Sequence, residues 1–195
     1  ERETSENAIR VLVLTPTREL AQQVHHSFVK YSQGLGLNAV VAYGGASINP
    51  QIDALNAGCD VLVATPGRLL ELAMKELIDL SAVETLILDE ADRMLDMGFI
   101  IDIERILKRL PDTRQTLFFS ATFNDEVFAL SKTILNQPKL IEVAERNATA
   151  AKVEQRIYEV DNKRKAGLVA YLIGSKNWQQ VLIFTRTKQA VDDLV

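Results

Sequence analysis

The 195-residue chain has few of the side chains that hold metals or form disulfides. It contains one cysteine, Cys59, and two histidines, His25 and His26, which are neighbours. One thiol cannot form an internal disulfide, and this usage is typical of a reducing cytosol, so we expect a cytoplasmic protein. These three side chains provide no cysteine–histidine spacing typical of a metal site. The sequence therefore excludes a disulfide-stapled scaffold.

Long apolar runs and an excess of positive charge are also missing. No run approaches the roughly 20 apolar residues of a transmembrane helix, so we expect no membrane association. The first residues, 1–6, are charged or polar and do not form a secretory signal. The net charge is −4, with a pI near 5.3. Any binding to nucleic acid must therefore use a few local donors and helix ends.

Short β-branched runs alternate with longer amphipathic stretches, which is typical of an α/β fold with a parallel sheet flanked by helices. Helical spacing is clear at Leu20, Val24 and Phe28, which recur on one helix face. Several strand candidates are apolar at nearly every position, as in strands covered on both faces. The runs that predict strands are 10–14, 39–43, 60–64, 85–88, 116–119, 139–143, 156–160 and 181–184.

A polar stretch of small residues divides the chain. Residues 1–143 predict a first domain, 144–152 a linker, and 153–195 the beginning of a second domain. The second part is too short for an independent α/β domain. We therefore expect a piece of a longer protein, with both domains incomplete.

Two strand ends are near copies of each other, Thr15–Arg18 (TPTR) and Thr65–Arg68 (TPGR). In each, threonine suits the N-cap of a following helix and proline suits its first position. Free backbone N–H groups, the positive helix end and an arginine then meet at the carboxyl edge of the sheet, which suits phosphate. Two such sites favour a polyanionic strand as the ligand. The alternative is a pair of well-capped turns with no ligand.

Acidic residues follow another strand, 85–88. An apolar strand that ends in Asp89 and Glu90 is the arrangement that P-loop ATPases use for Mg²⁺ and water. Asp89 can hold Mg²⁺ through water, and Glu90 can polarise the water that attacks a γ-phosphate. The same pair is common as a cap and first-turn acid of a helix. Two weaker signals are the hydroxyl residues Ser120 and Thr122 after another strand run and a further strand-then-Thr/Arg sequence at 181–188.

Six short motifs occur in order along the chain. They are PTRELA (16–21), GG (44–45), TPGR (65–68), DEAD (89–92), SAT (120–122) and VLIFTRTK (181–188). Their order and spacing resemble the DEAD-box ATP-dependent RNA helicases of superfamily 2 over essentially the whole chain. The resemblance implies most of a first RecA-like domain and the start of a second. Members close two such domains over ATP and single-stranded RNA and unwind short duplexes locally.

The resemblance also implies cofactors, a partner and roles for individual residues. The cofactors are ATP and Mg²⁺, and the partner is RNA. Asp89 and Glu90 are the expected catalytic residues, with Asp89 also holding Mg²⁺ through water. The expected coupling residues, which link the nucleotide state to unwinding, are Asp92, Ser120 and Thr122. The expected RNA contacts are Pro16, Thr17, Arg18, Gly45, Thr65, Gly67, Arg68, Phe184 and Thr185. Contacts to the RNA backbone carry no base information, so we expect little sequence specificity.

Several parts of such an enzyme are missing from the sequence. A Walker A loop needs Gly-x-x-x-x-Gly-Lys-Ser/Thr, and none of the nine glycines is followed by lysine. The family's glutamine motif and later arginine motifs are absent as well. We therefore expect the full-length parent to hydrolyse ATP and this chain alone to be inactive. Two alternatives stay open: a non-catalytic RNA- or partner-binding module, and a relative that acts on DNA.

Overall fold

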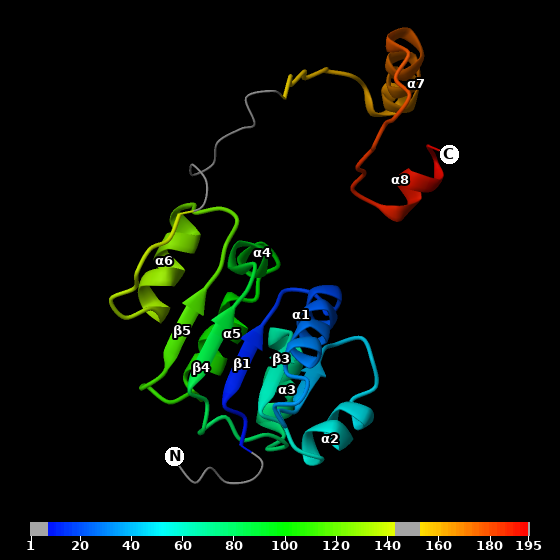
Figure 1. The fold of residues 1–195 in the computed structure, drawn as a ribbon. Helices are drawn as coiled ribbons and strands as arrows, with labels where there is room; N and C mark the ends of the chain where they lie inside the picture. The colour runs from blue at the N-terminus through cyan, green and yellow to red at the C-terminus, as the bar shows by residue number, and fades with distance from the viewer. Residues whose placement is uncertain (1–7, 143–152, 195) are drawn as a thin grey trace. The chain divides into compact units, whose positions relative to one another are not determined.

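The computed structural model describes residues 8–142 and 153–194 (Figure 1). Its contacts divide the chain into two compact units, residues 1–148 and 149–195. The predicted linker, 144–152, lies outside the described residues. Within the two described ranges, no helix is long and apolar enough to cross a membrane.

The first unit contains a five-stranded sheet in the order β2-β3-β1-β4-β5. Its strands are β1 (Val11–Leu14), β2 (Ala39–Ala42), β3 (Val61–Ala64), β4 (Thr85–Leu88) and β5 (Gln115–Phe118). All neighbouring pairs are parallel, and the arrows in Figure 1 accordingly run in one direction. The predicted parallel sheet is therefore confirmed, with each of these strands within one residue of its predicted range.

Helices cover both faces of this sheet. They are α1 (Arg18–Tyr31), α2 (Asn49–Asn56), α3 (Pro66–Met74), α4 (Ala91–Asp96), α5 (Ile100–Leu107) and α6 (Asp125–Ile134). The larger hydrophobic cluster joins one face of the sheet to α2 through α6. The smaller cluster joins the opposite face to α1. The sheet is thus the middle layer, as the apolar strand runs predict.

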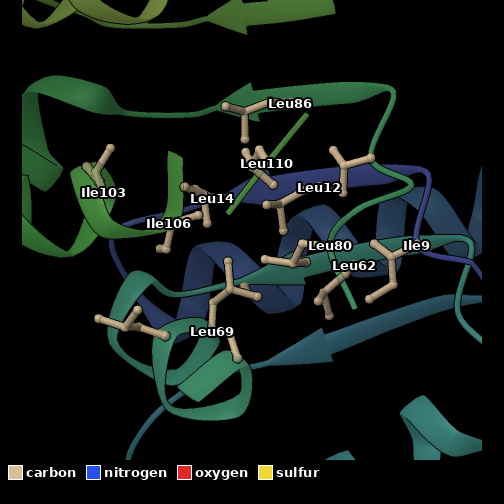
Figure 2. Packing of buried hydrophobic residues seen from close by; sticks show 14 of the residues in the cluster. Ile9, Leu12, Leu14, Leu62, Leu69, Leu80, Leu86, Ile103, Ile106 and Leu110 are labelled. Atoms are coloured by element: carbon tan, nitrogen blue, oxygen red, sulfur yellow. The ribbon is translucent and has the colours of Figure 1, made fainter. Parts of the chain in front are cut away.

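The main core lies between the sheet and the helices of the first face. Leu62, Leu12 and Leu86 come from the neighbouring strands β3, β1 and β4 and share one face (Figure 2). Ile106 of α5 belongs to the same cluster, and all four side chains are fully buried. Successive strand residues point to opposite faces, so Val13 instead belongs to the cluster with α1.

The two similar turns begin their helices differently. The side-chain oxygen of Thr17 accepts a 3.2 Å hydrogen bond from Leu20 N–H, so α1 starts only at Arg18. In the second copy the helix already starts at Pro66. Proline at the first helical position is therefore confirmed for Pro66 and wrong for Pro16. A second threonine is available to cap the first turn, whereas Gly67 offers no side-chain cap in the second.

Three predicted strands are not formed. Residues 139–142 form no strand, and residue 143 lies outside the described part. The runs 156–160 and 181–184 also lack strand pairing and are largely solvent-exposed. An apolar run becomes a strand only when another strand offers its backbone hydrogen bonds. The described residues 153–194 contain no such neighbour.

The second unit is helical in its described part. Its elements are the 3₁₀ turn η1 (Asn162–Arg164), α7 (Lys165–Lys176) and α8 (Lys188–Asp192). Thr187 caps α8, because its side-chain oxygen accepts a 3.2 Å hydrogen bond from Ala190 N–H. A capped helix therefore follows the run 181–184, although that run itself forms no strand.

Candidate functional site

Parallel pairing brings most of the predicted site residues to one edge of the sheet. Leu14 lies beside both Ala64 and Leu88, and Leu88 lies beside Phe118. The residues that follow these positions therefore emerge together at the carboxyl edge, marked by the arrowheads in Figure 1. This edge is where open parallel α/β sheets bind ligands.

The first turn places one exposed arginine at this edge. Pro16 is buried, Thr17 is half-buried, and Arg18 is exposed. The Arg18 guanidinium carbon lies 5.1 Å from the ring centroid of Tyr43, which follows β2. The Tyr43 hydroxyl accepts a 2.8 Å hydrogen bond from Gln22 Nε2 on α1. Stacking on the ring orients the arginine while its charge stays open to solvent.

Two glycines leave open backbone at the ends of neighbouring strands, Gly45 after β2 and Gly67 after β3. Gly45 has a φ of +75°, a left-handed conformation that other residues adopt with strain. Apart from the neighbouring residues and the backbone of the same helix, no atom lies within 4 Å of the position that a Cβ would take at Gly45 or at Gly67. A ligand backbone can therefore approach the main chain closely at both positions.

Arg68, from the second turn, is buried rather than open. Its side chain is 8% exposed, and Nη2 donates a 2.9 Å hydrogen bond to the carbonyl of Ala46. Nε donates a 3.1 Å hydrogen bond to Glu71 Oε2. Its Nη1 atom is buried without a partner among the described residues. Thr65 is likewise 8% exposed. The structure thus brings Arg68 to the predicted edge with two of its three nitrogens bonded inside the protein.

The acidic pair stands at the end of β4. Asp89 N–H donates a 3.0 Å hydrogen bond to the carbonyl of Leu14, which ties it to the central strand. Burial raises the pKa of the Asp89 carboxyl above its ordinary value, although the 3.0 Å hydrogen bond from Glu90 N–H opposes the rise. No other described residue donates to that carboxylate. One oxygen of Asp89 is therefore free for a ligand.

Glu90 has an unusual backbone conformation. Its φ of 51° and ψ of 52° are left-handed, which costs a non-glycine residue about 1 kcal/mol or more. Its carboxylate lies 3.4 Å from Arg93 Nη1, and both side chains are well exposed. Strain of this kind clusters at functional sites, and here it turns the chain sharply between β4 and α4. The sequence pattern does not predict this left-handed conformation.

Asp92 is bonded across to the loop that follows β5. Its Oδ2 accepts hydrogen bonds from Thr122 N–H at 3.0 Å and from Thr122 Oγ1 at 2.8 Å. The Ser120 hydroxyl donates a 2.6 Å hydrogen bond to the carbonyl of Thr122. Burial acts to raise the pKa of Asp92, but the hydrogen bonds, led by those from Thr122, hold it below its ordinary value. The three predicted coupling residues thus form one network.

The described residues do not surround a metal site with protein ligands alone. No group of three or more His, Cys, Asp or Glu side chains that could hold a metal occurs within residues 8–142 and 153–194. Mg²⁺, however, keeps several waters and commonly uses one or two carboxylates together with phosphate oxygens. The carboxylate oxygen of Asp89 that accepts no hydrogen bond from the described residues fits that requirement.

The remaining two predicted residues belong to the second unit. Phe184 is 86% exposed, and the Thr185 hydroxyl donates a 2.9 Å hydrogen bond to the carbonyl of Thr187. Thr185 therefore supports the turn that leads into α8.

A sequence model of the DEAD/DEAH box helicase family matches residues 2–130, which is most of the chain. The chain belongs to this helicase family.

Named relatives agree with the assignment to the helicase family. DEAD-box ATP-dependent RNA helicase CshA of Streptococcus pneumoniae is 40% identical over 191 residues, which are 98% of this chain and 36% of that protein. ATP-dependent RNA helicase RhlB of Xanthomonas axonopodis pv. citri is 42% identical over 186 residues, covering 94% and 33% respectively. This helicase-family chain therefore spans about a third of the length of these curated relatives.

Solved structures of the same kind share the fold. The crystal structure of a DEAD box protein from Methanococcus jannaschii aligns with a TM-score of 0.67 and 36% identity, covering 96% of this chain and 50% of that one. That of a hypothetical ATP-dependent RNA helicase from Sulfolobus tokodaii aligns with a TM-score of 0.64 and 40% identity, covering 67% and 39%. The RecA-like helicase fold is thereby confirmed.

Sequence reasoning misses two residues of this helicase edge, Tyr43 and Gln51. Gln51 is 8% exposed in α2, where it shares the inner helix face with Leu55. A polar residue four positions before a buried leucine is a weak signal of a buried hydrogen-bonding role. Tyr43 gives no comparable signal, since the partners of its side chain, Arg18 and Gln22, come from α1.

Proposed function

We propose that this chain is part of an ATP-dependent RNA helicase that unwinds RNA duplexes locally as two RecA-like domains close on one strand. The observation that carries the proposal is the meeting of Asp89, Arg18 and Gly45 at one sheet edge in a DEAD/DEAH-box family member. Acidic groups for a metal–nucleotide complex and open donors for phosphates are thereby present on one surface. Its named relatives are RNA helicases, which favours RNA over DNA.

Asp89 and Glu90 would serve the nucleotide. Asp89 offers one free carboxylate oxygen, which suits a hydrated Mg²⁺ bound to ATP. Bound Mg²⁺ supplies charge stabilisation for the transferring phosphoryl group. The Glu90 carboxylate is exposed enough to orient the attacking water and accept its proton.

A second group of residues would contact the RNA backbone. Arg18 supplies an oriented, exposed positive charge, and the open backbone at Gly45 and Gly67 supplies close approach. The other proposed contacts are Pro16, Thr17, Thr65, Arg68, Phe184 and Thr185. Since such contacts go to phosphate and sugar, affinity should depend little on base sequence.

Asp92, Ser120 and Thr122 would link the two activities. Asp92 starts the helix after the acidic pair, and its hydrogen bonds reach the loop after the next strand. A shift at Asp89 on nucleotide binding would therefore be felt at Thr122 through a short bonded path.

The chain alone should not hydrolyse ATP, because its sequence contains no Gly-Lys pair with which to build a Walker A loop. The test compares ATP hydrolysis by the chain with that of a version extended at both ends to the length of its relatives, each with and without single-stranded RNA. RNA-stimulated turnover by the extended version alone would support the proposal. Turnover by the short chain would refute its inactivity, and RNA binding without any turnover would favour a non-catalytic module.

A further inference from the structure

The loop between β2 and α2 carries both Gly44 and Gly45 and is held by a buried amide. Gln51 Oε1 accepts a 3.2 Å hydrogen bond from Tyr43 N–H. Gln51 Nε2 donates to the carbonyls of Tyr43 at 3.1 Å and Ser47 at 3.2 Å. Only 8% of this residue is exposed, so these bonds are largely shielded from water. One side chain thus fixes the loop on both sides of the two glycines.

Arg68 holds the same loop from a different helix. Its Nη2 donates a 2.9 Å hydrogen bond to the carbonyl of Ala46, between the glycines and Ser47. The 3.1 Å bond from Nε to Glu71 keeps the guanidinium in that orientation. Lysine could not make both bonds with the same geometry, because it lacks the planar fork of arginine.

Gly44 and Gly45 themselves make few contacts with the rest of the protein. Both are exposed, and no atom outside the neighbouring residues lies within 4 Å of where a Cβ would stand at either position. Glycine loses more conformational freedom on ordering than any other residue. A loop that must present open backbone to a ligand therefore needs support from its flanks, and Gln51 and Arg68 supply it.

We propose that Gln51 and Arg68 are positioning residues that hold the Gly44–Gly45 loop in the shape that receives the RNA backbone. The inference rests on the proposed function, since it assumes that this loop contacts RNA. It also changes the role proposed for Arg68 from a phosphate contact to a clamp on the loop.

The test uses the extended version and measures its RNA-stimulated ATP hydrolysis against RNA concentration, together with single-stranded RNA binding by fluorescence anisotropy. Gln51→Met keeps the volume and removes all three hydrogen bonds, and Gln51→Ala is the second variant. We expect the KM for RNA to rise about tenfold in both, with kcat at saturating RNA unchanged. Asn56→Ala, at the exposed far end of the same helix, should leave KM unchanged.

Salt dependence separates the two roles of Arg68. Loss of one phosphate contact to a single strand lowers the slope of log affinity against log salt by about 0.7. Loss of a residue that only holds the loop weakens the affinity for RNA without changing that slope. Arg68→Ala should therefore behave like Gln51→Met, whereas Arg18→Ala should reduce the slope.

Three results would overturn the proposal. If a folded Gln51→Met variant binds RNA with normal affinity, Gln51 does not position the loop, and the proposed function is unaffected. A reduced salt slope in Arg68→Ala restores that residue as a phosphate contact. If the unaltered extended version does not bind RNA, both the proposed function and the positioning role are refuted.

Hydrogen exchange at the Tyr43 amide reports whether the loop was loosened, and we expect it to be faster in both Gln51 variants.

Discussion

The contact between Asp92 and Thr122 should contribute measurably to the stability of the first unit. Thr122→Val removes the 2.8 Å hydroxyl bond to Asp92 Oδ2 and keeps the size of the side chain. Asp92→Ala removes the acceptor altogether. The double variant closes a cycle in which the coupling free energy measures that single bond.

The magnitude follows from the surroundings of the two residues. A hydrogen bond to a charged group contributes roughly 1.5–3 kcal/mol when it is shielded from water. Asp92 is only half-buried and Thr122 is exposed, so solvent screening reduces the expected coupling to about 1 kcal/mol. That corresponds to about a fivefold change in the folding equilibrium and a shift of roughly 3–5 °C in Tm.

Urea unfolding followed by far-UV circular dichroism is the suitable assay. Fluorescence would mislead, because the only tryptophan, Trp178, lies in the second unit. A matched cycle of Asp96→Ala with Thr122→Val should be additive, since Asp96 is an exposed residue on the same helix. If the Asp92 cycle is equally additive, the bond described between α4 and the loop after β5 does not stabilise the fold.

Three further outcomes are expected. In the extended version, Glu90→Gln should keep ATP and RNA binding while hydrolysis falls by orders of magnitude, because only water activation is lost; equal turnover in both proteins would remove Glu90 from the mechanism. The stability advantage of the wild type over Asp92→Asn should be full at neutral pH and shrink as pH falls below about 4, since the lowered pKa of Asp92 in the fold stabilises only its charged form; urea unfolding at several pH values tests this, and a constant difference would contradict it. Leu86→Ala should destabilise the first unit by about 2–5 kcal/mol, against less than about 0.5 kcal/mol for Leu140→Ala, because Leu86 is fully buried and Leu140 is 58% exposed; similar losses in urea unfolding would mean that the core is elsewhere.

Local pattern was enough to find the sheet and its working edge. The strands at 11–14, 39–42 and 61–64 are apolar at every position, and this property can be seen in consecutive residues of the sequence. The start of α3 at Pro66 after Thr65 is equally local, whereas the first turn caps its helix with Thr17 in place of the predicted Thr15. The same reasoning correctly brought the acidic pair to the carboxyl edge.

Features that depend on residues far away in the chain could not be predicted from the sequence. The runs 156–160 and 181–184 have strand composition, but pairing is decided by neighbours that composition does not name. The left-handed Glu90 is imposed by the turn between β4 and α4, not by any preference of glutamate. Burial of Arg68 could not be foreseen either, since it depends on a carbonyl at Ala46, far away in sequence.

The position of β1 at the centre of the sheet has a consequence for synthesis on the ribosome. Val11 is made before both of its sheet partners, Val61 on one side and Thr85 on the other. A nascent chain that has exported β3 can pair only one edge of β1, and the second edge stays open until β4 emerges. During that interval one edge of an apolar strand is exposed, and it is covered only when β4, the strand directly before the DEAD motif, emerges.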